Sequence, residues 1–356
     1  MIKKFIKSLI AKLNYLFEIQ QIPDPLNNIN IETTSKCNLS CKFCAYDKRD
    51  LEKVPLTTMS IENFDEIVNQ SLNLGYKNIG LTPTTGDIFM DKGIMKKLNI
   101  LELKSLLDGY YFYTNFIPIN EDNIKKLFYL KKLKSFGISI YGHDEESFKL
   151  YSNGSINSYN KLIKNLNFLL NYIKNFNLNN LKIEISQRTK RGFELGKSES
   201  ELSTILKKLL SNKNIEYSQN SEFNNWGGIV KEHDIKDLDI KLNDTNQKKI
   251  GSCSLIYSRM MIGANGLVNA CACRDANFTL AIGDLNKNKL NEIINIKNKK
   301  YKDLIDRQEK NDFPDVCKSC DFYRSIYTKN DFIWSFRDKK IKKYSLKETL
   351  KLLNER

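Results

Sequence analysis

The stretch "CNLSCKFC", residues 37–44, places three cysteines on one short segment. Cys37, Cys41 and Cys44 are separated by three and two residues, and Phe43 stands directly before the last of them. A structural zinc site needs four ligands, usually as two close pairs, and neither histidine of the chain is near this segment. A four-iron cluster takes one thiolate per iron, so three cysteines leave one iron open. The spacing therefore favours an iron–sulfur cluster with one free coordination position.

The chain on both sides of this segment alternates between strand and helix patterns. Six such repeats predict an α/β fold with a parallel sheet and right-handed crossovers, either open or closed into an incomplete barrel. In both arrangements the chemistry belongs at the carboxyl ends of the strands, where the three cysteines fall. Strands are predicted over 29–34, 78–82, 110–114, 135–140, 181–187 and 214–219, and helices over 60–74, 91–107, 121–132, 156–175 and 198–211.

The regular alternation stops after "NNWGG", residues 224–228, and a second group of cysteines follows. Cys253, Cys271, Cys317 and Cys320 are separated by 17, 45 and 2 residues. Between them, "GANGLVNACACRD" (263–275) predicts a β-hairpin with Asn-Gly at its turn. Four thiolates can close a second cluster completely, although a C-x-x-C pair alone also suits zinc or redox chemistry.

Composition limits the classes of function. The chain has 356 residues, 41% of them hydrophobic, and a net charge of +15 from 57 basic and 42 acidic residues. The basic residues are spread evenly and accompany many Asn and Ile, which favours a coding bias over a nucleic-acid partner. No secretory signal and no uncharged run of about 18–20 residues is present. We therefore expect a cytoplasmic protein, whose clustered thiols bind metal rather than form disulfides. Two histidines leave little with which to build a hydrolytic triad.

The two ends of the chain have their own patterns. Residues 1–28 comprise an amphipathic helix over 1–17 and a linker, and apolar residues recur at helical spacing opposite lysines. We favour a helix packed on the main body over an anchor on a membrane surface. Residues 331–356 are predicted to form a Lys-rich helical tail.

The C-x3-C-x-Φ-C motif after the first strand, with Phe43 at Φ, resembles that of the radical S-adenosylmethionine (SAM) superfamily. The resemblance implies a partial (β/α)6 TIM-like barrel over 29–225, with a 4Fe–4S cluster on Cys37, Cys41 and Cys44. The open iron would chelate SAM, whose reductive cleavage gives a 5′-deoxyadenosyl radical that abstracts a substrate hydrogen. It also implies an electron donor of the flavodoxin or ferredoxin type.

The same resemblance assigns SAM contacts at the ends of successive strands. Thr85, Gly86 and Asp87 stand where the family carries a Gly-Gly-Glu-like segment for the SAM amino group. Asp is one methylene shorter than Glu, so a backbone carbonyl is the alternative contact. Ribose contacts are expected from Thr114–Asn115 and Ser139. For the SAM carboxylate we expect Ser186 and Arg188, although Arg188 is equally suited to a surface ion pair.

The second cysteine group resembles the SPASM/twitch extensions of radical SAM enzymes, here over 226–330. There are too few cysteines for the two-cluster form. The one-cluster twitch type, to which the amino-cyclitol dehydrogenase of the butirosin pathway belongs, implies a second 4Fe–4S cluster on Cys253, Cys271, Cys317 and Cys320. Cys273 is left over, and three interpretations stay open: a hydrogen-atom donor, a spare ligand, or a small buried side chain.

Other candidate substrate groups are less specific. His143 follows the fourth strand and suits either a general base or a helix cap. Trp226 and Asn225 lie at the domain junction, where packing is the simpler role for the indole. The remaining candidates are Arg259, Arg274 and Asp275.

Three functions follow from these observations. The resemblance first implies a radical SAM oxidoreductase or epimerase acting on a sugar, amino-cyclitol or sugar-nucleotide. The alternative is a maturase of a ribosomally made peptide, for which residues 1–28 are too short to hold the usual peptide-binding domain. A non-catalytic metal- or nucleic-acid-binding protein is the third, and it predicts zinc rather than iron.

Overall fold

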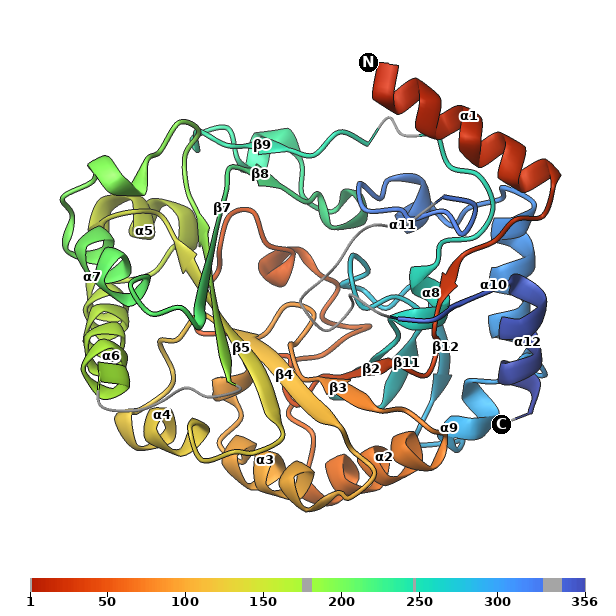
Figure 1. The fold of residues 1–356 in the computed structure, drawn as a ribbon, viewed down its shortest axis with the longest axis horizontal. Helices are drawn as coiled ribbons and strands as arrows, with labels where there is room; N and C mark the ends of the chain where they lie inside the picture. The colour runs from red at the N-terminus through yellow and green to blue at the C-terminus, as the bar shows by residue number, and fades with distance from the viewer. Residues whose placement is uncertain (1, 175–180, 246–247, 329–340, 356) are drawn as a thin grey trace.

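The structure is a computed structural model that describes residues 2–174, 181–245, 248–328 and 341–355 (Figure 1). Its centre is a nine-stranded sheet in the order β12-β11-β10-β2-β3-β4-β5-β6-β7. All pairs from β10–β2 to β6–β7 are parallel. The six predicted strands are confirmed as β2 (Asn28–Ile31), β3 (Asn78–Gly80), β4 (Gly109–Thr114), β5 (Leu133–Tyr141), β6 (Lys182–Arg188) and β7 (Ile215–Asn220).

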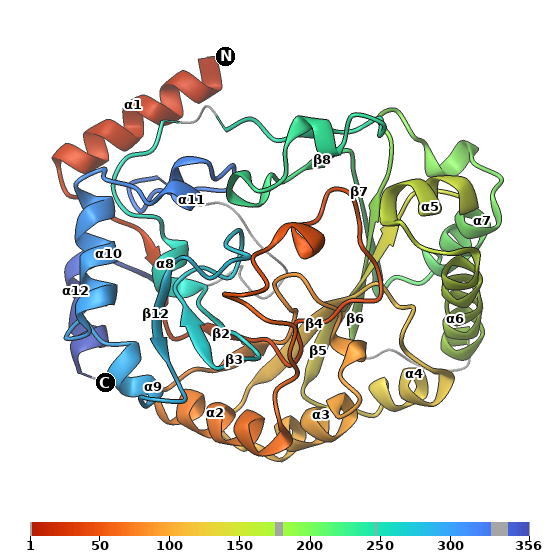
Figure 2. The same ribbon diagram turned by 180° about the vertical axis from the view of Figure 1, so that it is seen from behind.

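Helices cover the outer side of this curved sheet, as expected for a partial TIM-like barrel (Figures 1 and 2). Local sequence explains where they begin: Ser60 caps the first barrel helix by accepting a hydrogen bond from the Asn63 amide, and Gly75, at φ +93°, follows its end. The barrel helices are α2 (Ile61–Asn73), α3 (Ile94–Leu103), α4 (Glu121–Leu127), α5 (Glu145–Ser152), α6 (Ile156–Lys174) and α7 (Glu201–Leu209).

The predicted hairpin at Asn265–Gly266 is also confirmed, and it extends the barrel sheet. Strand β10 (Met261–Ile262) pairs parallel to β2 on one side and antiparallel to β11 (Leu267–Asn269) on the other. Gly266 has φ +87°, which the turn requires and which favours glycine. Strand β12 (Ala281–Asp284) completes this edge. Because of these pairings, the second cysteine group is attached directly to the edge of the barrel that carries the first group.

The remaining elements surround the hairpin and the barrel mouth. Helices α9 and α10 pack against β12, and the short strands form two small two-stranded sheets, β1–β13 and β8–β9. These elements are β1 (Ile22–Pro23), β8 (Glu222–Phe223), β9 (Lys241–Leu242), α8 (Leu255–Ser258), α9 (Leu290–Ile293), α10 (Lys299–Glu309), α11 (Asp315–Lys318), β13 (Lys343–Tyr344) and α12 (Leu346–Asn354).

The predicted N-terminal helix is present as α1 (Ile2–Leu16) and lies at the edge of the molecule (Figure 1). It packs on the body as expected, but through its more polar side, with the apolar side facing away. The predicted tail helix is present as α12, while residues 331–340 of the tail lie outside the described residues. Among the described helices, none is both long enough and apolar enough to cross a bilayer.

Candidate active site between two cysteine groups

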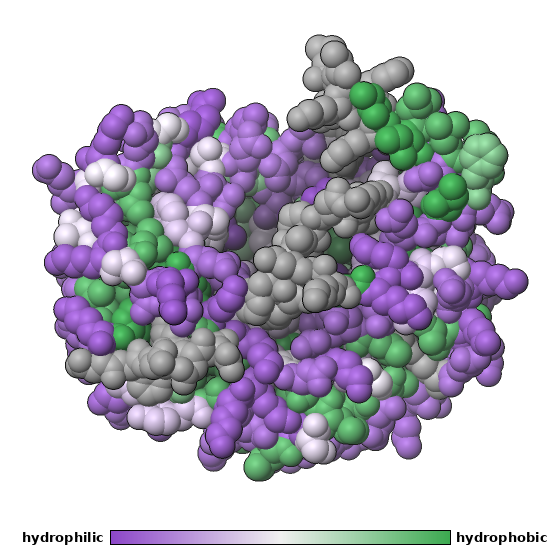
Figure 3. Space-filling model, viewed as in Figure 1, coloured by the Kyte–Doolittle hydropathy of each residue, from purple (hydrophilic) through white to green (hydrophobic). Residues whose placement is uncertain are grey.

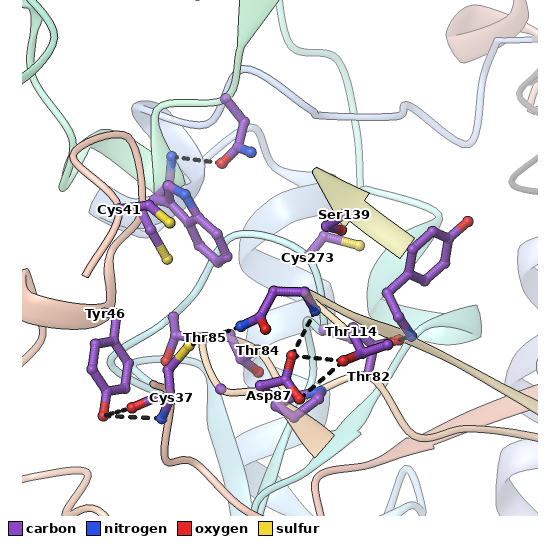
Figure 4. Close-up of a pocket in the computed structure, with 18 of the residues that line it drawn as sticks. Cys37, Cys41, Tyr46, Thr82, Thr84, Thr85, Asp87, Thr114, Ser139 and Cys273 are labelled. Atoms are coloured by element: carbon purple, nitrogen blue, oxygen red, sulfur yellow. Dashed lines mark hydrogen bonds between the residues drawn. The ribbon is translucent and has the colours of Figure 1, made fainter. Parts of the chain in front are cut away.

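A cavity of about 310 Å³ opens at the carboxyl ends of the barrel strands. Cys37, Cys41 and Cys44 line it on the loop after β2, and Cys273 lines it from the hairpin segment (Figure 4). Two regions that are more than 200 residues apart in sequence therefore share one space. Its other polar lining groups include Asn30, Thr82, Thr84, Thr85, Asp87, Tyr111, Tyr113, Asn115, Ser139, Arg188, Asn224, Arg259 and Arg274.

The first cysteine loop is held by contacts on both sides of Phe43. The Phe43 ring is buried and lies 4.6 Å from the ring of Phe223 and 5.4 Å from that of Tyr141, measured between centroids. The Trp226 indole donates a hydrogen bond to the Phe43 carbonyl at 3.1 Å. Trp226 lines the cavity as well, so its packing role and its exposure to a ligand coexist.

Trp226 and its neighbour connect the two cysteine groups. While Trp226 bonds the backbone between Cys41 and Cys44, the Asn225 side-chain amide donates to the Ser319 carbonyl at 2.7 Å. Ser319 lies between Cys317 and Cys320. Two consecutive residues thus tie the loops of both groups to the same short segment.

The segment after β3 runs against the first cysteine loop at backbone contact distance. A Cβ added at Gly86 would lie 2.8 Å from the carbonyl oxygens of Thr34 and Lys36, so only glycine is accommodated without a shift. The next amide, of Asp87, donates to the Lys36 carbonyl at 2.8 Å. The position that the resemblance compares with the second Gly of Gly-Gly-Glu is therefore glycine for a steric reason that the structure makes explicit.

The Asp87 carboxylate points toward the end of β4. It accepts hydrogen bonds from the Thr114 hydroxyl at 2.9 Å and from the Asn115 amide at 2.7 Å. Burial raises the pKa of Asp87, while these donors act in the opposite direction. Since Oδ1 also accepts from the Phe89 amide at 3.0 Å, both oxygens are engaged, and the side chain is less suited to a ligand ammonium than the backbone of Thr85 and Gly86, two residues that line the cavity.

Arg49 stabilises the same region, although the sequence alone did not indicate a role for it. Its guanidinium is buried and donates to the Thr85 hydroxyl at 2.9 Å and to the Ser35 carbonyl at 3.0 Å. Arg49 thereby links the segment after β3 to the start of the cysteine loop. No motif distinguishes this arginine from the many other basic residues of the sequence, so only the tertiary contacts identify it.

Asn115 performs a similar task on the other side. Its side-chain amide donates to the Asn38 side-chain oxygen at 2.8 Å and lies 4.0 Å from the sulfur of Cys37. Its side-chain oxygen accepts from the Ile117 amide at 3.0 Å. The predicted ribose contact is therefore also a support for the first cysteine loop.

The ends of β5 and β6 supply the remaining predicted SAM contacts. Ser139 and Arg188 line the cavity, and the Arg188 guanidinium lies 5.8 Å from the centroid of the Tyr141 ring. Arg188 is close enough to Cys41 and Cys44 to lower the pKa of both thiols, against the larger effect of burial, which raises them. Ser186 pairs with Ser139 across the strands but is not among the residues that line the cavity.

The second group brings four sulfurs together from three chain segments. Each sulfur accepts one N–H hydrogen bond: Cys271 from the Cys273 amide at 3.4 Å, and Cys253 from the Arg324 amide at 3.4 Å. Cys320 accepts from the Phe322 amide at 3.2 Å. Hydrogen bonds to cluster sulfurs are one of the factors that set a cluster's reduction potential.

The fourth of these donors is the side chain of Gln308, which sequence reasoning missed. Gln308 lies on α10, is fully buried, and donates from Nε2 to the Cys317 sulfur at 3.4 Å. Its Oε1 accepts from the Cys253 amide at 2.9 Å. One glutamine thus bridges two members of the second group, and nothing in its sequence neighbourhood reveals this.

Cys273 contacts the second group and the cavity at once. Its side chain is 8% exposed, it lines the cavity, and its backbone amide bonds the Cys271 sulfur. Cys273 also belongs to the buried apolar core. Its position leaves all three interpretations open: hydrogen-atom donor, spare ligand and small buried side chain.

Tyr113 and Glu184 form a second pair that the sequence did not indicate. Tyr113 lines the cavity, and its hydroxyl donates to Oε2 of Glu184 on β6, two strands away. The other oxygen of this carboxylate, Oε1, is buried without a hydrogen-bond partner among the described residues. A tyrosine of the cavity lining is thus hydrogen-bonded to a carboxylate.

His143 lies outside the cavity lining. Its Nδ1 is 3.0 Å from the Thr189 hydroxyl, and its ring packs 4.8 Å from that of Phe193. Burial lowers the pKa of His143 despite the nearby Asp144. Asp144, rather than His143, caps α5. The geometry gives no support to His143 as the base.

Of the three remaining candidate substrate residues, two line the cavity and one stabilises the segment next to it. Arg259 and Arg274 line the cavity. The Arg274 guanidinium also pairs with Asp321 at 3.2 Å and lies 4.4 Å from the Phe322 ring centroid, next to the second cysteine group. Asp275 is buried and accepts three hydrogen bonds from Thr279 and Leu280, so it holds the hairpin segment together.

The donor chemistry of both groups suits iron–sulfur clusters. All seven sulfurs are those of free cysteines, and burial raises the pKa of Cys37 and of Cys253 to about 12. Thiolates in such places require positively charged partners, which cluster irons provide. Within the described residues, no three His, Cys, Asp or Glu side chains converge as ligands of one metal ion. In a four-iron cluster each thiolate binds a different iron, so its ligands are more widely spaced.

Comparison with known proteins assigns both regions. Residues 31–183 match the radical SAM superfamily, and residues 253–321 match the SPASM iron-sulfur cluster-binding domain. The chain carries a radical SAM domain followed by a SPASM domain. The matched ranges contain all seven cysteines of the two groups. The radical SAM domain implies SAM and a 4Fe–4S cluster as cofactors, and the SPASM domain implies additional iron–sulfur clusters.

Solved structures support the same fold. BtrN, crystallised with AdoMet and 2-DOIA, is similar with a TM-score of 0.52 at 14% identity, over 83% of this chain and 92% of that one. A histidine-tagged form of anSMEcpe with bound AdoMet is similar with a TM-score of 0.50 at 13% identity, over 92% and 91%. No curated protein sequence matches the chain. At these identities the two structures establish the fold and leave the substrate open.

Proposed function

We propose that this radical SAM protein oxidises a carbohydrate-like small molecule, such as a sugar, an amino-cyclitol or a sugar-nucleotide, at a carbon that bears a hydroxyl group. One observation carries the proposal: a single cavity is lined both by Cys37, Cys41 and Cys44 and by Cys273, two residues from Cys271 of the second group. A substrate in this cavity would lie between the two cluster sites.

The lining of the cavity favours a polar substrate. Hydroxyl and amide groups such as those of Asn30, Thr84, Tyr111 and Asn224 alternate with aromatic surface on its wall. Such a lining suits the hydroxyl groups and apolar faces of a sugar ring.

The residues have distinct proposed roles. When bound, SAM and the two clusters would supply the radical that removes a substrate hydrogen and the site that accepts the remaining electron. Arg188 would bind the SAM carboxylate, and the carbonyls of Thr85 and Gly86 would bind its ammonium group. Tyr113 would take the hydroxyl proton of the substrate while passing its own proton to the Glu184 carboxylate. Loss of a hydrogen atom, a proton and an electron converts the carbinol to a carbonyl.

The surroundings of the second group suit electron acceptance. Four N–H groups donate to its sulfurs, and such hydrogen bonds stabilise added negative charge and so raise the reduction potential. The cyclitol dehydrogenase BtrN, whose fold this chain shares, adds to the case for oxidation. A flavodoxin or ferredoxin in the cytoplasm as electron donor is part of the proposal.

Epimerisation is the second candidate, and Cys273 favours it. A thiol at the cavity wall can return a hydrogen atom to a substrate radical, and the product then differs from the substrate only in configuration. The neighbouring second group would have to restore the thiol with an electron and a proton. Oxidation needs no thiol in this position, so Cys273 separates the two candidates.

The test is turnover of candidate sugars and amino-cyclitols in deuterated water, with wild type and Cys273→Ala compared. Oxidation predicts a product two electrons more oxidised, without solvent deuterium on carbon, from both proteins. A product that has the composition of the substrate but carries deuterium on carbon would favour epimerisation over oxidation, provided that Cys273→Ala no longer forms it. Modification of a peptide substrate, with no turnover of any carbohydrate, would instead favour a maturase, the class to which the structurally similar anSME belongs.

A further inference from the structure

Helix α1 turns its apolar stripe away from the protein body. Five large apolar residues of the helix are exposed, and their exposed fractions range from 45% for Leu13 to 73% for Leu16. Two more follow directly after the helix, so the apolar surface continues past its end. Figure 3 shows this surface as a green area over α1 at the edge of the molecule. The residues are Ile6, Leu9, Ile10, Leu13, Leu16, Phe17 and Ile19.

The opposite side of the helix fixes this orientation. Ala11 is buried, and the Asn14 side chain donates to the Tyr327 carbonyl at 2.8 Å. The Tyr15 hydroxyl donates to the Glu309 carbonyl at 3.0 Å, and its ring packs edge-on against that of Tyr327, with 4.9 Å between centroids. The helix is attached to the body by specific contacts that leave the apolar stripe outward.

The charge of the helix is all of one sign. Ile2–Leu16 contains four lysines and no acidic residue. At 100° per residue, the exposed Lys12 falls at one border of the stripe, about 40° from Leu16. A helix with an apolar face bordered by lysines is the pattern that lies in the interface of an anionic bilayer.

We propose that α1 docks the protein on the surface of a membrane rich in anionic lipid, with the stripe from Ile6 to Ile19 inserted among the headgroups. Lysine side chains at the borders would reach the lipid phosphates while their alkyl chains cover the edge of the stripe. A second copy of the chain is a poorer occupant. Two stripes face to face would bring the bordering lysines of both helices together, and the helix itself holds no acidic residue to pair with them, since the nearest acid, Glu18, follows its end. This proposal does not depend on the proposed function.

The test is flotation of the full chain with vesicles of phosphatidylglycerol and phosphatidylcholine, compared with vesicles of phosphatidylcholine alone. We expect wild type to float with the anionic vesicles and to dissociate as salt is raised. Leu9→Glu/Leu13→Glu places charge on the stripe and should abolish flotation. The matched control is Leu103→Glu on α3, where an equally apolar side chain is 83% exposed, and it should float like wild type.

A second variant separates the contribution of the lysine charges from that of the apolar stripe. Replacing Lys3, Lys4, Lys7 and Lys12 by Gln keeps the stripe and should weaken binding to anionic vesicles by up to about a thousandfold. SAM cleavage should be unchanged in all these variants, which shows that they fold. Equal flotation of wild type and Leu9→Glu/Leu13→Glu would overturn the proposal. So would a wild-type dimer that the same double variant dissociates, without any binding to vesicles.

Discussion

The two groups of cysteines differ in how the chain assembles them. Cys37, Cys41 and Cys44 come from one eight-residue loop, and all three line the cavity. The second group comes from three separate segments, and its four sulfurs each accept an N–H hydrogen bond but do not line the cavity. Both groups consist of buried and half-buried thiols at neighbouring parts of one sheet, so burial alone does not account for their difference.

We propose that the two groups have different roles: the open group would bind the cosubstrate, and the closed group would store an electron. Three ligands on an open wall leave a coordination position for a cosubstrate, as an open catalytic metal site does. Four ligands behind the wall leave none, and hydrogen bonds to their sulfurs favour the storage of an electron. Asn225 and Trp226 donate hydrogen bonds to the two cysteine loops, and these bonds fix the position of one loop relative to the other. We expect substitutions in the two groups to give different, separable losses.

The largest effect is expected from Cys41→Ala in the open group. It should reduce the iron content from about eight to about four per chain and abolish SAM cleavage, because one of the four-iron clusters loses a ligand. Elemental analysis and detection of 5′-deoxyadenosine after anaerobic reduction measure both. Cys273→Ala is the matched control in the same cavity and should keep eight irons and full cleavage. Undiminished cleavage by Cys41→Ala would refute the assignment of the open group.

The next effect is expected from Cys271→Ala in the closed group. Iron should again fall to about four, and product formation should be lost, yet SAM cleavage in the absence of substrate should persist. The thermal unfolding temperature should also fall, because this group joins three segments and its metal binding contributes to folding. If product still forms at the wild-type rate, the closed group has no part in turnover.

A smaller effect is expected from the bridging glutamine. Gln308→Leu leaves the buried Cys253 amide without an acceptor and removes the donor to Cys317, so the free energy of unfolding should fall by about 1–3 kcal/mol. The reduction potential of the closed cluster should become more negative. Denaturant unfolding and a redox titration under argon measure the two quantities.

Gln308→Glu is the control, since it keeps an acceptor for the amide while it loses the donor. It should recover part of the stability but keep the shifted potential. An unshifted potential in both variants would show that this hydrogen bond does not tune the cluster.

The smallest effect is expected at His143, which lies outside the cavity. His143→Gln should leave turnover near that of wild type. Because burial lowers the pKa of the folded imidazole below its unfolded value, wild type loses stability as the pH falls from about 6.5 through the folded pKa. The variant should lose less, as measured by unfolding at pH 5.5 and pH 7.5. A large drop in turnover with normal stability would return His143 to the list of candidate bases.

Much of the fold follows from the sequence because local patterns and the global sheet agree. Strand β4, with its run of aromatic residues, and helix α2, with Ser60 at its start and Gly75 after its end, are determined by neighbouring residues. The hairpin at Asn265–Gly266 is fixed by its turn. The pairing of β10 with β2 is not visible locally, since it joins segments about 230 residues apart.

The site was predictable where one residue type at a fixed spacing is required. Cysteine ligands and a glycine in close backbone contact are such cases. Arg49, Gln308 and the Tyr113–Glu184 pair were missed because ordinary residues acquire these roles only through distant contacts. The orientation of α1 was missed for a different reason: its pattern shows which face is apolar, but not whether protein or another surface covers it.

Reductive cleavage of SAM by the wild-type chain tests most directly whether the first cysteine group binds a cluster that cleaves SAM. The protein is reconstituted with iron and sulfide without oxygen, its iron is counted, and it is given SAM and a strong reductant. We expect about eight irons per chain and formation of 5′-deoxyadenosine and methionine. A protein that holds both clusters intact by spectroscopy and yet forms no 5′-deoxyadenosine would refute this role of the first group.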